Sequence, residues 1–127
     1  MADKKVALIT GTSSGFGLIT AIELARAGYR VIATMRDPAK KERLMSEAKT
    51  TGVADSIEVR RLDVTKFDEL PGIVGEIVRD RGRIDVLVNN AGYALAGFAE
   101  DISHAELQQQ LDTNFFGAVE IDRKSVV

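Results

Sequence analysis

The sequence predicts an α/β fold in which a doubly wound parallel sheet is covered by helices on both faces. Strand-like apolar runs alternate with helix-like periodic segments along all 127 residues, as in repeated β-α units. We interpret the strand-like runs as continuous apolar stretches, which is typical of strands covered on both faces. A glycine-rich turn follows the first run and opens onto a helical pattern, which is the layout of a phosphate-binding turn.

Four strands are predicted, at about 6–10, 30–35, 57–62 and 84–89. Right-handed crossovers between them give the spatial order 3-2-1-4. The carboxyl ends of the first and fourth strands then lie side by side where the strand order reverses, which is where ligands bind in such sheets. The length is that of one domain, so a single domain is expected over 1–127.

The first helix is expected between the first two strands, where four apolar residues recur at helical spacing and a glycine follows. They are Leu18, Ala21, Ile22 and Ala25, with Gly28 where a left-handed C-terminal residue is favoured. The second helix is predicted to begin at Asp37 and Pro38. An acidic N-cap there precedes a proline at the first helical position, where a missing N–H costs nothing.

The third helix has an apolar stripe and ends at Gly82; the stripe is Phe67, Leu70, Val74, Ile77 and Val78. Its start is left open, because the stretch from Thr65 to Asp68 resembles a capping box whereas Pro71 is a second place for the helix to start.

A fourth helix is expected from Ser103, which has Glu106 three residues later as in a capping box, to about Asp112. The stretch from Asn114 begins like another helix.

Composition argues against several classes of function. A formal net charge of -2 provides no basic field for nucleic acid or an anionic membrane. With no cysteine and one histidine, disulfides and thiolate chemistry are excluded and a zinc site is disfavoured, so no metal ligand is assigned. No segment approaches the length of a membrane-spanning helix, and a cytoplasmic protein is expected.

The turn from Thr10 to Gly17 is the strongest functional signal in the chain. A chain that leaves a strand there must bring its backbone close to a phosphate and aim the N–H groups of a helix start at it, which glycine permits. The loop from Asn89 to Gly92 follows the fourth strand, so both loops should face one crevice. A P-loop is excluded, because no lysine follows the final glycine of the turn. A phosphoacceptor domain is disfavoured, because Thr10 and Gly11 stand where a carboxylate pair should follow the first strand.

Four features in this order resemble the short-chain dehydrogenases/reductases. They are TGTSSGFG at 10–17, LDVT at 62–65, NNAG at 89–92, and Asn114 in the helix that follows. The resemblance covers essentially the whole chain, but only the N-terminal half of a typical member. It implies a truncated Rossmann-like fold that binds NAD(H) or NADP(H), and reversible hydride transfer between an alcohol and a carbonyl.

The resemblance also implies which residues hold the dinucleotide. Asp63 would accept a hydrogen bond from the adenine amine and Val64 would pack on the ring, although an acid after a strand also commonly caps a turn. The loop at 89–92 would pass its backbone along the ribose, although Asn and Gly also suit an ordinary turn. The candidate cofactor-binding residues are Gly11, Ser13, Ser14, Gly15, Phe16, Gly17, Arg36, Asp63, Val64, Asn90, Ala91 and Gly92.

The end of the second strand decides which cofactor fits, because the adenosine ribose lies there. An acid at this place binds the 2′-hydroxyl, whereas a cation binds the 2′-phosphate. The uncharged Met35 stands where NAD-preferring relatives tend to carry the acid, and Arg36 follows with a guanidinium that matches phosphate in a bidentate manner. NADP(H) is therefore expected over NAD(H), and Asp37, the competing ribose contact, is interpreted as a cap.

The serine, tyrosine and lysine that carry out catalysis in the family have no counterpart in this chain. Neither Tyr29 nor Tyr93 has a lysine four residues later. Asn114 is the one candidate catalytic residue, because it corresponds to the asparagine that links the family's lysine to solvent through water. Without that lysine, a helix hydrogen bond is its expected role. His104 is interpreted as an exposed first-turn residue.

Two functions remain open at this point. One is an NADP(H)-dependent oxidoreductase, represented by its cofactor-binding half and acting on an unknown carbonyl or alcohol. The other is a non-enzymatic nucleotide-binding or decoy module that associates with full-length relatives. In both cases the strand at 84–89 forms an exposed apolar edge. We expect self-association through that edge or through the surface at Phe115 and Phe116, or else completion by another polypeptide.

Overall fold

The computed structural model describes residues 4–92 and 99–125. Its strands form one sheet in the order β3-β2-β1-β4, and every neighbouring pair is parallel. This confirms the predicted fold class and strand order. The strands are β1 (Val6–Ile9), β2 (Arg30–Met35), β3 (Ile57–Arg61) and β4 (Val86–Val88).

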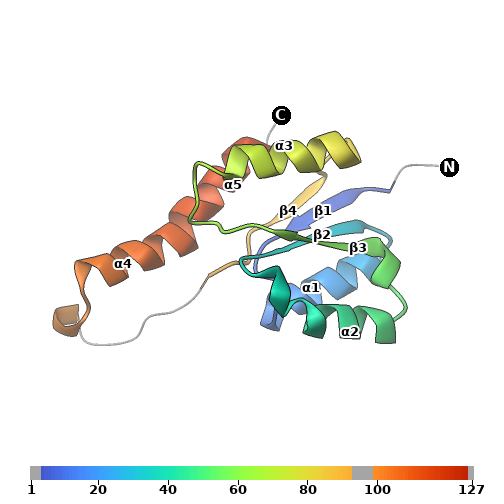
Figure 1. Cartoon of the computed structure of the whole chain (residues 1–127), viewed down its shortest axis with the longest axis horizontal. Coiled ribbons are helices and arrows are strands. Elements are labelled where there is room, and N and C mark those ends of the chain that lie inside the picture. The colour runs from blue at the N-terminus through green and yellow to red at the C-terminus, as the bar shows by residue number, and fades with distance from the viewer. Residues whose placement is uncertain (1–3, 93–98, 126–127) are drawn as a thin grey trace.

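Helices cover both faces of the sheet, as Figure 1 shows. On one face lie α1 (Gly15–Arg26) and α2 (Glu42–Thr50), and on the other lie α3 (Leu70–Arg81) and α5 (Gly117–Ser125). The remaining helix, α4 (His104–Leu111), projects beyond the carboxyl ends of the strands. Consecutive residues of β1 therefore point into different apolar layers: Ile9 packs with α1, whereas Leu8 packs with α3.

The interpretation of the third strand as a continuous apolar run is wrong. In β3, Glu58 and Arg60 alternate with Ile57 and Val59, which is the pattern of a strand with one partly open face. The strand lies at an edge of the sheet, where charged side chains reduce unwanted pairing with other chains.

Two helix ends agree with the prediction. Gly28 and Gly82 both have positive φ, at 99° and 82°, which is the left-handed conformation that glycine adopts without steric cost. The capping box is also present, since Ser103 Oγ accepts from the N–H of Glu106 and the Glu106 carboxylate accepts from the N–H of Ser103.

Two helix starts differ from the prediction. Asp37 Oδ1 accepts from the N–H of Ala39 and caps only a short 3₁₀ turn, so the expected second helix does not begin there but at Glu42. The capping box considered near Thr65 does not form, because the Thr65 hydroxyl donates to Asp63 instead. The third helix begins at Leu70, with Pro71 in its first turn.

The helix that was expected to end near Asp112 instead continues without a break. A π-helical turn, Asp112–Phe116, joins α4 to α5, and we call this continuous helix the α4–α5 rod. A π turn accommodates one residue more than an α turn. The 12 residue steps from Gln109 to Ile121 therefore complete close to three turns, so both lie on about the same face of the rod.

The π turn gives the rod two straight faces. The inner face carries residues that line a pocket or are buried, namely Gln109, Thr113, Gly117 and Ile121. The outer face carries exposed apolar residues at the same spacing, namely Leu107, Leu111, Phe115 and Val119. The inner end of the rod is fixed by Ile121, which packs with Leu62, Val64 and Leu70 in one buried cluster.

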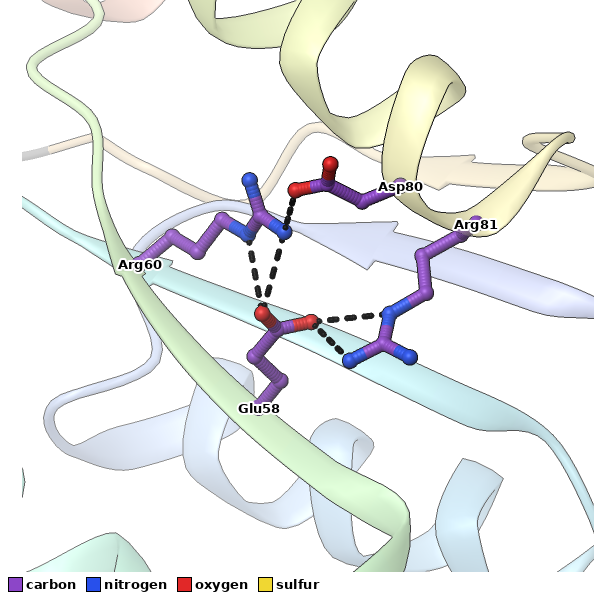
Figure 2. A network of polar contacts seen from close by, with 4 residues as sticks. All are labelled: Glu58, Arg60, Asp80 and Arg81. Carbon is purple, nitrogen blue, oxygen red and sulfur yellow. Dashed lines mark hydrogen bonds and ion pairs between the residues drawn. The ribbon is translucent and has the colours of Figure 1, made fainter.

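An ion-pair network ties the edge strand β3 to the end of α3 (Figure 2). Glu58 accepts from Arg60 through one carboxylate oxygen and from Arg81 through the other, and Arg60 also donates to Asp80 at 2.7 Å. The Arg60 hydrogen bond holds the pKa of Asp80 below its usual range. The Arg60 and Glu58 side chains are only 17% and 27% exposed, so water screens this network less than an ordinary surface pair.

Replacing Glu58 with glutamine is expected to lower the free energy of unfolding by about 1–2 kcal/mol, because the guanidinium groups of Arg60 and Arg81 lose the negative charge of the carboxylate that both contact. Glu23→Gln is the matched control, since the Glu23–Arg26 pair is 61% and 57% exposed and should contribute less than about 0.5 kcal/mol. Urea denaturation measures both values. Equal effects of the two substitutions would contradict a stabilising role for the network.

Candidate functional site

A pocket of about 720 Å³ opens at the carboxyl ends of the strands. Its wall comes from the turn after β1, the end of β2, the segment after β3, the loop after β4, and the α4–α5 rod. The lining residues are Gly11, Ser13, Met35, Arg36, Leu62, Asp63, Val64, Thr65, Ala91, Gly92, Gln109 and Thr113.

The turn after β1 and the loop after β4 meet and are bonded to each other. The buried hydroxyl of Thr10 accepts from the N–H groups of Asn90 and Ala91, both at 3.0 Å. Asn90 Nδ2 donates to the carbonyl of Gly11 at 3.0 Å. Two segments about 80 residues apart are thereby held as one rigid edge, as expected from the strand order.

The glycines of the turn are required by close packing at two positions and leave open space at a third. A Cβ on Gly11 would lie 2.9 Å from Cα of Ala91, and a Cβ on Gly17 would overlap the Gly11 carbonyl oxygen. Gly15 has a φ of +60° and nothing within 4 Å of its Cβ position. The N-cap of α1, Ser14, makes no side-chain capping bond, so the first N–H groups of the helix are left for an anion.

Asp63 adopts the turn-capping role that was considered for it, without using its whole carboxylate. Its Oδ1 accepts from Thr65 N at 2.9 Å and from Thr65 Oγ1 at 2.7 Å, whereas Oδ2 makes no hydrogen bond to another described residue. Burial raises the pKa of Asp63, but the Thr65 hydrogen bonds and the charges of Arg36 and Lys66 outweigh it and lower the pKa overall. Asp63 is therefore a carboxylate at neutral pH and acts only as an acceptor.

Of the residues predicted to bind cofactor, seven line the pocket: Gly11, Ser13, Arg36, Asp63, Val64, Ala91 and Gly92. Ser14, Gly15 and Phe16 are exposed at the start of α1, beside this wall. Gly17 and Asn90 lie behind it and hold the two loops together. Binding of a cofactor by these residues stays a prediction.

Five lining residues were not among the predicted cofactor-binding residues: Met35, Leu62, Thr65, Gln109 and Thr113. Met35, Leu62 and Thr65 are sequence neighbours of predicted residues, so the predicted strand ends already place them beside the pocket. Gln109 and Thr113 come from a helix, and their only signal was a spacing of four residues that continues to Gly117 and Ile121. In a regular α-helix that spacing drifts off one face, so the signal has meaning only with the π turn.

Asn114 lies in the π turn, next to the loop after β4. A Cβ on Gly92 would be 2.9 Å from Asn114 Oδ1, so the glycine lets the asparagine approach the loop backbone. His104 is the first residue of α4 and is exposed. Tyr93 lies outside the described residues. A catalytic role for Asn114 stays a prediction.

Within residues 4–92 and 99–125, no three His, Cys, Asp or Glu side chains are grouped to hold a metal ion. In that same part of the chain, no helix is both long and apolar enough to span a bilayer.

The model of the short chain dehydrogenase family matches residues 5–126. The chain belongs to this family. Over 121 residues it is 45% identical to the uncharacterized oxidoreductase YusZ of Bacillus subtilis, and the match covers 95% of this chain and 42% of that protein. It is 42% identical over 123 residues to human retinol dehydrogenase 8, covering 94% of this chain and 38% of that protein.

Solved structures of short-chain dehydrogenases have the same fold. An actinorhodin polyketide ketoreductase with NADPH superposes with a TM-score of 0.88 at 30% identity, over 97% of this chain and 46% of that one. A 3-ketoacyl-(acyl-carrier-protein) reductase from Brucella melitensis, complexed with NADH, gives 0.85 at 32% identity, over 98% and 49%. The chain thus spans less than half the length of the short-chain dehydrogenases that it matches here.

Proposed function

We propose that residues 1–127 form one domain, the NADP(H)-binding part of a short-chain dehydrogenase that transfers hydride between an alcohol and a carbonyl. The observation that carries the proposal is the bonded junction of the two loops, because it places the open helix start and the pocket at one edge. Such an edge suits a ligand with phosphates and an adenosine. Membership of the family supports the same function.

The residues present fit a dinucleotide. The uncapped N–H groups at the start of α1 and the open space beside Gly15 suit the pyrophosphate. The Asp63 carboxylate is an acceptor for the adenine amine, and Val64 is an apolar part of the same wall. The bound cofactor would supply the hydride, while the protein holds and orients it.

A preference for NADP(H) over NAD(H) is part of the proposal. Met35 is 3% exposed at the end of β2, and the exposed Arg36 follows it on the pocket wall. Met35 has no carboxylate that could bind the 2′-hydroxyl of the ribose, and a guanidinium is the side chain best matched to a 2′-phosphate. Several solved relatives hold NADPH or NADP and another holds NADH, so family membership alone allows either cofactor and the proposed preference rests on Met35 and Arg36.

A second candidate is a non-enzymatic nucleotide-binding module that associates with full-length relatives. It predicts that residues 1–127, in which no tyrosine is followed by a lysine four residues later, bind the cofactor without turnover. Hydride transfer to a carbonyl carbon leaves negative charge on the oxygen, which a proton donor at that oxygen neutralises. Calorimetric titration with NADPH, followed by an NADPH-oxidation assay with a panel of carbonyls, tests the candidates. Binding with turnover excludes the non-enzymatic module, binding without turnover shows that these residues alone do not catalyse, and no binding refutes both candidates.

The proposed ligands are the dinucleotide and an unidentified carbonyl or alcohol. The net charge of -2 argues against nucleic acid and anionic membranes as partners. A cytoplasmic location stays a prediction from composition.

Self-association is proposed for the chain as it stands, through the edge of β4. The other edge strand, β3, carries the charged network of Figure 2, whereas β4 consists of three half-buried apolar residues, Val86–Val88. An apolar edge with unpaired backbone groups favours pairing with a second chain. The surface at Phe115 and Phe116, which are 55% and 42% exposed, is the alternative contact.

Light scattering at increasing concentration is expected to show dimers or larger species of the natural chain. Val86→Lys should shift the population to monomer by placing a charge on the edge. Ile19→Lys is the control, because Ile19 is an exposed apolar residue of α1, away from β4. A monomer restored by Phe115→Ser but not by Val86→Lys would assign the contact to the rod. A natural chain that stays monomeric at high concentration would contradict both contacts.

A further inference from the structure

One wall of the pocket comes from a helix face rather than from a strand end. Gln109 of α4 and Thr113 of the π turn lie there, and Asp63, Val64 and Thr65 of the segment that follows β3 line the same pocket. The Gln109 amide makes no hydrogen bond to another described residue, whereas the adjacent Gln108 donates Nε2 to Asp112 Oδ1 at 2.7 Å. Gln109 therefore presents a donor and an acceptor to the pocket.

The position of Gln109 is set by packing further along the rod. Gly117 lies close to the segment that follows β3, because a Cβ added to this glycine would be 2.5 Å from the carbonyl oxygen of Val64. Gly92 allows the same close approach at Asn114. These two contacts hold the rod over the pocket, and the π turn between Gln109 and Gly117 keeps both on one face.

We propose that Gln109 is a specificity residue that reads the adenine of the dinucleotide. The proposal rests on the function proposed above. Adenine presents amino hydrogens beside the ring acceptor N7, and a glutamine amide pairs with both through one acceptor and one donor. The Asp63 carboxylate, which lines the same pocket, would accept the other amino hydrogen. The two side chains together would select an amino purine over an oxo purine.

The test is calorimetric titration with NADPH and with its deamino analogue, in which hypoxanthine replaces adenine. In the analogue an oxygen replaces the amino group, so both Gln109 and Asp63 lose their donor. The natural chain is expected to bind NADPH about 100-fold more tightly than the analogue. Gln109→Ala should weaken NADPH about 10-fold and the analogue less than about 3-fold, so that discrimination falls.

Gln108→Ala is the matched control, because it removes a glutamine amide one residue away that bonds to Asp112 and does not line the pocket. It should bind both ligands as the natural chain does. Gln109 is exposed, so its loss should leave the fold intact, which circular dichroism verifies. If Gln109→Ala keeps the natural discrimination, the role of Gln109 is overturned while the proposed function stands. If the natural chain binds neither ligand, the proposed function and this inference are both overturned.

Discussion

Gly17→Ala is expected to lower the free energy of unfolding by about 3 kcal/mol and to abolish NADPH binding. The added Cβ would overlap the carbonyl oxygen of Gly11 and lie 2.5 Å from Asn90 Nδ2. Neither atom can move aside easily, because the Asn90 amide is bonded to Gly11 and the Asn90 backbone is bonded to Thr10. The two loops must separate to admit the methyl group. Urea denaturation and calorimetry measure the two effects.

Gly75→Ala provides the matched control for this substitution. Gly75 lies within α3, has helical backbone and has nothing within 4 Å of its Cβ position. Alanine there should stabilise the chain by about 0.5–1 kcal/mol, because glycine is the poorer helix former. If the two variants unfold at the same urea concentration, the close contact at Gly17 has no energetic importance.

Arg36→Ala is expected to weaken NADPH binding about 10- to 100-fold and to change NADH binding by less than about 3-fold. A guanidinium paired with a phosphate makes charge-assisted hydrogen bonds, each stronger than a neutral one, and each 1.4 kcal/mol corresponds to a factor of ten. Arg36 is exposed on the pocket wall. Salt should therefore reduce the difference between the two cofactors.

Arg43→Ala is the control for a general effect of charge, because Arg43 is an exposed residue of α2 that does not line this pocket. It should change the binding of both cofactors only slightly. An equal loss of NADPH and NADH affinity in Arg36→Ala would show that Arg36 does not contact the 2′-phosphate.

The sheet could be predicted closely because its determinants are local or topological. Right-handed crossovers give the observed order, and β2 has the predicted bounds. The fourth strand was predicted too long, at 84–89. At both ends of β4 a side-chain oxygen accepts a backbone N–H in place of a strand carbonyl: Asp85 Oδ2 accepts from Val6 N, and Thr10 Oγ1 accepts from Asn90 N. Such bonds depend on residues far apart in sequence, so a local pattern does not reveal them.

The helical wall of the pocket could not be predicted for the same reason. The capping box at Ser103 fixes the start of α4 locally, and it was predicted. The continuation through Asp112–Phe116 depends on contacts of Gly92 and Gly117 with distant segments. The lining role of Gln109 therefore became visible only in three dimensions.

The π turn also sets the rotation of α4 relative to α5. Each α-helical residue advances the direction of a side chain by about 100°. Loss of one residue within 112–116 would restore a regular helix and rotate everything before it relative to Gly117, whose seat against Val64 would stay unchanged. A length change of a single codon would thus present a different side chain to the pocket and leave the sheet undisturbed.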